Sequence, residues 1–102
     1  EELVFEPNEA KKYLREPNFF ERIGEFKSAA AAVGLWAEST LEALVIHLAE
    51  EHEVRSGDFI HAVRWAISGR SVGPSFYAML RVLGKERVLR RLQLAGSLGV
   101  SA

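Results

Sequence analysis

The sequence has no cysteine, and only three prolines and one methionine, among its 102 residues. The lack of cysteine excludes disulfide bonds, thiolate zinc sites and cysteine nucleophiles, and it fits a reducing compartment, so we expect a cytoplasmic protein. No apolar run approaches the roughly 20 residues that a membrane-spanning helix needs. The first residues, EELVFEPNEA, are acidic where a signal peptide would be basic. We therefore expect a soluble protein with no membrane partner.

The sequence also lacks the motifs of common enzymes. It contains no G-x-x-x-x-G-K-[ST] or G-x-G-x-x-G loop that could hold nucleotide phosphates, and no G-x-S-x-G nucleophile. His47 and His52 are five residues apart, which places them about 140° apart on a helix and prevents them from sharing a metal. His61 has no acid or nucleophile at a suitable spacing. We predict no catalytic residue, no metal site and no cofactor in this chain.

The composition is that of one ordinary globular domain, with 48% hydrophobic and 26% charged residues. The sequence opens with Glu1 instead of methionine, so we expect a piece of a longer protein. Residues 1–6 are predicted to be a linker, residues 7–95 a helical domain, and the Gly/Ser-rich residues 96–102 a flexible tail.

Apolar residues recur at helical spacing along most of the chain, and no segment alternates as a strand would. The expected helices cover residues 8–15, 19–33, 39–52, 56–68, 74–83 and 85–95. The fold class is therefore predicted to be all-α, a bundle of five to six helices with short connections.

Three local features refine these helices. Gly34 is expected to end the second helix in a left-handed conformation. Ser39 and Glu42 form an S-x-x-E pattern, which predicts a capping box at the start of the third helix. In the fourth helix, a projection at 100° per residue places Arg64 at the edge of the apolar arc and Trp65 on the opposite side.

Charge is distributed unevenly along the chain. The stretch from Arg64 to Leu92 contains seven Lys or Arg residues and one acid, Glu86, and so carries about +6. Residues 1–63 contain six Lys or Arg and thirteen Asp or Glu, which gives about −7. The net charge of −1 therefore conceals a polarised chain. This polarity favours a polyanionic partner for the basic stretch, although a basic surface can also simply be solvated.

The same stretch combines an arginine, a Ser-Gly pair, a loop with a proline, an apolar helix, and then Leu-Gly-Lys-Glu-Arg and Arg-Leu. These features are Arg64, Ser68-Gly69, Pro74, Phe76 to Leu80, Leu83 to Arg87, and Arg91-Leu92. In this order they resemble the C-terminal anticodon-binding region of bacterial-type glutamyl-tRNA synthetases. The first half resembles the family more loosely, in the PNEAKKYL segment and in a helix that opens near Ser39.

The resemblance implies a helical cage subdomain that binds the anticodon loop of the tRNA for glutamate. It implies that the residues contacting the anticodon are Arg64, Gly73, Pro74, Ser75 and Phe76. The candidates for sequence-independent phosphate contacts are Arg70, Lys85 and Arg87. It also implies that this chain is part of a longer parent protein, a glutamate–tRNA ligase. The other partners of this chain would then be two parts of the same parent: a catalytic domain that uses ATP and Mg²⁺, and a preceding helical subdomain.

Several alternatives remain open at this point. The guanidinium of Arg64 could project outward or could pair with an acid inside the domain. Phe76 also belongs to the predicted core, so it could both pack and contact RNA, or only pack. The domain could instead be a protein-interaction scaffold that does not bind RNA. A helix-turn-helix that reads duplex DNA is a further option, but its loop, residues 69–75, is longer than the usual three or four residues.

Overall fold

The computed structural model describes residues 12–69 and 75–100, with side chains for residues 12–69 and 75–98. A helical turn at residues 12–15 precedes the helices, which are α2 (Phe19–Ala31), α3 (Glu38–Glu51), α4 (Ser56–Ser68), α5 (Phe76–Leu83) and α6 (Lys85–Val100). The described part contains no strand, so the prediction of an all-α bundle is confirmed. None of the helices within these ranges is long and apolar enough to cross a bilayer. The predicted linker, residues 1–6, lies outside the described residues.

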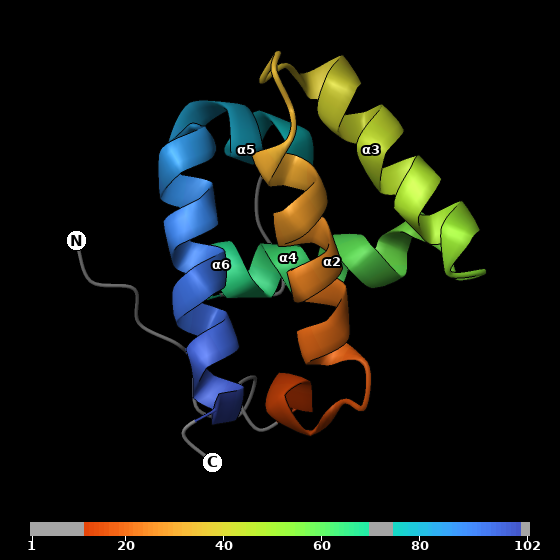
Figure 1. Cartoon of the computed structure of the whole chain (residues 1–102), viewed down its shortest axis with the longest axis vertical. Coiled ribbons are helices and arrows are strands. Elements are labelled where there is room, and N and C mark those ends of the chain that lie inside the picture. The colour runs from red at the N-terminus through yellow and green to blue at the C-terminus, as the bar shows by residue number, and fades with distance from the viewer. Residues whose placement is uncertain (1–11, 70–74, 101–102) are drawn as a thin grey trace.

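The helices pack in two directions around α4. Figure 1 shows α2 and α6 running side by side, with α4 crossing behind them and α5 lying over their upper end. Helix α3 leans away from this body, and it contacts α2, α4 and α5. Gly84 alone separates α5 from α6, and its positive φ of 86° favours glycine at this sharp junction. This arrangement places α4 in the interior.

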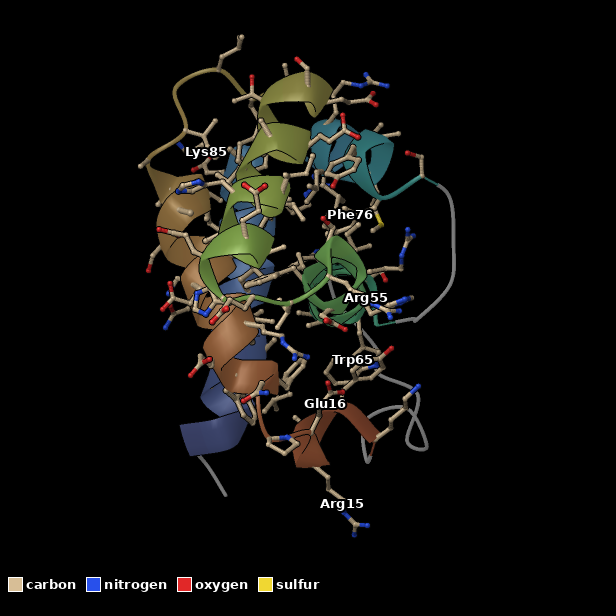
Figure 2. All side chains as sticks on the ribbon, turned by 90° about the vertical axis from the view of Figure 1, so that its right-hand side faces the viewer. Arg15, Glu16, Arg55, Trp65, Phe76 and Lys85 are labelled. Carbon is tan, nitrogen blue, oxygen red and sulfur yellow. The ribbon has the colours of Figure 1, made fainter. Side chains whose placement is uncertain are left out.

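Helix α4 is buried on more sides than its sequence pattern predicts. Trp65 is fully buried, although the helical projection placed it opposite the apolar arc, so this prediction was wrong. Its indole stacks on Tyr13 at 5.2 Å between ring centroids and meets the edge of Phe19 at 5.5 Å. The helical turn at residues 12–15, which carries Tyr13, therefore covers the face of α4 on which Trp65 lies. Figure 2 shows Trp65 in the lower half of the molecule, above the turn that carries Arg15 and Glu16.

The helix ends show which local signals determine the structure. Gly69 ends α4 with a φ of 77°, as its position in the pattern predicts. Among the described glycines, only Gly69 and Gly84 have a positive φ. The prediction of a left-handed conformation at Gly34 was therefore wrong. Helix α2 ends instead through a tight turn, in which the N–H groups of Ala32 and Val33 bond to carbonyls three residues earlier, at 3.2 and 3.1 Å.

The predicted capping box of Ser39 and Glu42 is also absent. Helix α3 starts one residue earlier, at Glu38, and its N-cap, Ala37, makes no side-chain cap hydrogen bond. Glu38 accepts a hydrogen bond from Arg81 Nε of α5 at 2.8 Å. The first residue of α3 is therefore bonded to another helix, α5, and the N-cap residue of α3 makes no side-chain bond.

Helix α6 continues to Val100, although its predicted end was Ala95. Ala95 is fully buried, and Leu98 packs against the core cluster. The additional turn therefore buries apolar surface, which stabilises the helix despite the glycines in this segment.

We predict that Trp65→Ala lowers the free energy of unfolding by about 3–5 kcal/mol, because it removes the largest fully buried side chain and leaves a cavity. Urea denaturation measures this change. Leu94→Ala is the control, since Leu94 is 55% exposed and its truncation should change stability by less than about 0.5 kcal/mol. Similar losses in the two variants would contradict the placement of Trp65 in the core.

Candidate nucleic-acid interface

The structure brings together two of the predicted site residues, Arg64 and Phe76. Arg64 lies in the last turns of α4, and Phe76 is the first residue of α5. The guanidinium carbon of Arg64 is 5.7 Å from the centroid of the Phe76 ring, within the distance over which a cation and a ring face attract each other. The pair therefore joins the two helices that flank residues 70–74.

Phe76 is a core residue, as its helical spacing predicts. It is 4% exposed, and its ring contacts Phe26 of α2 and Tyr77, with centroids at 6.5 and 5.1 Å. Figure 2 shows Phe76 at the beginning of α5, between the ribbons of α5 and α4 in this view. The buried ring gives the guanidinium of Arg64 a rigid surface to rest on. A direct contact between Phe76 and a base stays a prediction.

Ser75 occupies the entry to α5 and is exposed. Its carbonyl accepts a hydrogen bond from the Met79 N–H at 2.9 Å, and its hydroxyl makes no cap bond to the helix. The first N–H groups of a helix have no partner within that helix, so they are available to an acceptor outside it. Gly73 and Pro74, the other predicted contacts of this segment, lie outside the described residues, as does Arg70.

Two basic side chains of α6 are bonded to the ends of other helices. Nη1 of Arg91 donates to the carbonyl of Ile67, in the last turn of α4, at 2.7 Å. Nζ of Lys85 donates to the carbonyl of Val33, just beyond the end of α2, at 2.6 Å. Cations favour the negative end of a helix dipole, so both bonds stabilise helix C-termini. Sequence spacing gives no sign of either bond, because each depends on how the helices pack.

The candidate phosphate contacts therefore differ in their surroundings. Arg87 is exposed and lies one turn before Arg91, about 40° from it around α6. It consequently shares the side of α6 that meets the end of α4. Lys85 lies about 160° from Arg87 around the helix and faces the end of α2. Figure 2 shows Lys85 at the upper end of the molecule, near the connection between α2 and α3.

Acidic side chains border another surface of the domain, beside α3. Helix α3 carries Glu50 and Glu51, both exposed, and a groove between α2 and α3 is lined by Glu25, Glu51 and His47. Within the described ranges, no group of three or more His, Cys, Asp or Glu side chains is placed to hold a metal ion. Of the basic stretch, Arg91 bonds to the end of α4, whereas Arg81 pairs with Glu38 of α3 and Lys85 bonds to the residue beyond α2.

Comparison with known proteins identifies the family of the chain. Residues 1–95 match the family described as the anticodon binding domain. The chain belongs to that family. The end of α4 and the start of α5 are therefore the two described segments that flank the predicted contact loop of an anticodon binding domain.

The similar proteins are glutamate–tRNA ligases. The chain is 37% identical to that of Methylacidiphilum infernorum over 86 residues, which is 83% of this chain and 17% of the relative. It is 35% identical to that of Chloroherpeton thalassium over 92 residues (90% and 18%), and 33% identical to that of Elusimicrobium minutum over 95 residues (93% and 20%). The chain thus spans about a fifth of the length of these relatives.

The pKa of Tyr77, which follows Phe76 in α5, depends on how α5 packs against α3. Burial, and secondarily the negative charge of Glu42 in α3, raise the pKa of Tyr77 above the ordinary value of 10.0. The folded chain therefore holds this proton more tightly than the unfolded chain does.

We predict that Tyr77 ionises late in an alkaline titration followed by phenolate absorbance, and that Tyr77→Phe removes this late contribution. Because its folded pKa is raised, the stability that Tyr77 contributes is complete below about pH 10 and is lost as the pH rises through the folded pKa. The free energy of unfolding should therefore fall more steeply with alkaline pH in the wild type than in Tyr77→Phe. Equal slopes would contradict the packing of α5 on α3.

Proposed function

We propose that this chain is the tRNA anticodon-binding module of a glutamate–tRNA ligase, and that the end of α4 and the start of α5 bind the anticodon loop of the tRNA for glutamate. The observation that carries this proposal is the placement of Arg64 over Phe76. In a chain of the anticodon binding domain family, this pair flanks the loop that the resemblance selects as the contact site. The names of the similar ligases supply the identity of the tRNA.

Arg64 suits the reading of unstacked bases. Anticodon bases are splayed out of the stack, so a guanidinium can donate two parallel hydrogen bonds to a base edge. Contact with the Phe76 ring restricts the rotamers of Arg64 before RNA arrives, which lowers the entropy lost on binding. Gly73, Pro74 and Ser75 are proposed to contribute backbone and hydroxyl groups of the adjacent loop.

Phosphate attraction is proposed to come from basic side chains in the second half of the chain. Arg87 is the strongest candidate, because it is exposed and shares a side of α6 with the residue that contacts the end of α4. Lys85 uses one of its three N–H donors on the Val33 carbonyl, which leaves it two for a phosphate. Arg70 completes the set through its position in the loop sequence.

The chemistry of aminoacylation is assigned to the rest of the parent protein. The chain spans only about a fifth of the similar ligases. We therefore place the catalytic domain, with its ATP and Mg²⁺, and a preceding helical subdomain in the remainder of a longer chain. A cytoplasmic location is part of this proposal.

The family match disfavours a scaffold that has lost RNA binding. The acidic groove between α2 and α3 would be the natural surface for such a scaffold, because Glu25 and Glu51 give it a charge opposite to that of Arg64. Capture of a protein partner without retention of RNA would favour the scaffold over the proposed function.

We predict that Arg64→Ala weakens binding of a glutamate anticodon stem-loop by about 1–3 kcal/mol, as the loss of a base-reading arginine should. Gel shift at two salt concentrations measures this loss, and circular dichroism confirms that the variant is folded. Arg55→Ala is the matched control, because Arg55 is exposed at the start of α4 and its structural bond to Asp58 comes from the backbone N–H. Unchanged affinity in Arg64→Ala would overturn this assignment of the site.

A further inference from the structure

Three hydrogen bonds hold the C-terminal end of α4, two from its own last residues and one from α6. The Ser68 hydroxyl donates to the carbonyl of Arg64 at 2.6 Å, and the Gly69 N–H donates to that of Trp65 at 2.7 Å. The third bond runs from Arg91 of α6 to the carbonyl of Ile67, across 24 residues of sequence. Helix α4 has no basic residue in its own last turn, so Arg91 supplies the cation that this helix end favours.

Arg91 acts on the turn that directly follows Arg64. Arg64 and Ile67 are three residues apart, and side chains at this spacing lie on one face of a helix. The bond to the Ile67 carbonyl holds the end of α4 against α6, and it thereby holds the backbone from which the Arg64 side chain extends. The Arg64 guanidinium then rests on Phe76, so a continuous series of contacts runs from α6 through α4 to α5.

We infer that Arg91 is a positioning residue for base recognition, which determines specificity by holding the last turn of α4 and thereby orienting Arg64. This inference rests on the proposed function, and it gives Arg91 a role that the resemblance leaves open. Arg91 is half-buried and spends a guanidinium N–H on a backbone carbonyl, whereas Arg87, one turn earlier, is exposed. Arg91 therefore acts through Arg64, and Arg87 is the residue placed to meet phosphate.

A positioning role and a phosphate contact have different signatures. A misoriented Arg64 loses bonds to the base that it reads, so affinity falls for the cognate loop and little for a loop whose anticodon bases are all changed. A lost phosphate contact weakens binding to both loops equally and lowers the salt slope by about 1. The ratio of the two dissociation constants, together with the slope of affinity against salt, separates these roles.

The experiment compares Arg91→Met with two matched controls in the 102-residue chain. Arg90→Met removes an equal charge from the adjacent residue, which is exposed on the outer side of α6. Arg22→Met removes a different half-buried bond, from Arg22 Nη1 to Glu16 at 2.8 Å, and so controls for lost stability. Arg91→Lys keeps the charge and can still donate to the carbonyl. Each variant is titrated with the cognate glutamate stem-loop and with the changed stem-loop, at a temperature where all variants are folded.

Arg91→Met is expected to lower the discrimination ratio about 5- to 30-fold, within the range by which non-contacting residues modulate a coupled site, with an unchanged salt slope. Arg90→Met and Arg22→Met should leave the ratio unchanged, and Arg91→Lys should keep it within about twofold of wild type. An unchanged ratio in Arg91→Met, or an equal loss for both loops with a lower slope, would overturn the positioning role. A wild type that does not discriminate between the two loops would overturn the proposed function itself, and this inference with it.

Discussion

The structure depends on the burial of α4. This helix is enclosed by α2, α3, α6 and the helical turn at residues 12–15, and its buried residues include Phe59, Val63 and Trp65. A helix that is packed on most sides cannot rotate or slide without opening cavities in the core. The core therefore limits where its C-terminal turn can lie, and the bond from Arg91 holds that turn against α6. That constraint converts the packing of the core into a fixed direction for the Arg64 side chain.

The remaining polar bonds of the core region act on helix ends. Arg91 bonds to the last turn of α4, Lys85 to the residue beyond α2, and the Trp36 indole N–H to the Leu80 carbonyl near the end of α5, at 2.8 Å. In each case a side chain from one element donates to a backbone carbonyl at or beyond the end of another. The bonds of Lys85 and Trp36 connect the basic second half of the chain to the acidic first half.

Much of this fold could be predicted from the sequence, because the relevant signals are local. Helical periodicity gave the number and order of the helices, and Gly69 and Gly84 marked ends where the backbone has a positive φ. Predictions failed where tertiary contacts outweigh local preference. Trp65 is buried by a turn some 50 residues earlier in the chain, Gly34 is not needed as a left-handed stop, and Leu98 extends α6 by packing on the core.

The candidate site was predictable in a different way. No spacing rule indicates that Arg64 should meet Phe76, and that pair was selected through the resemblance to anticodon-binding regions. The bonds of Arg91 and Lys85 to carbonyls could not be predicted, since a backbone acceptor leaves no mark on the sequence. The only local hint is that α4 lacks a basic residue in its last turn, which leaves its C-terminus to be neutralised by another helix.

The most direct test of RNA docking at the end of α4 is to follow the backbone amide NMR signals of the chain during titration with a glutamate anticodon stem-loop. Signals from residues 64–69 and 75–77, and from Arg87 and Arg91 on α6, are expected to shift together, while those of His47 to Glu51 on α3 stay in place. Shifts concentrated in the acidic groove between α2 and α3, with the end of α4 unaffected, would contradict the claim that the buried helix presents Arg64 to RNA.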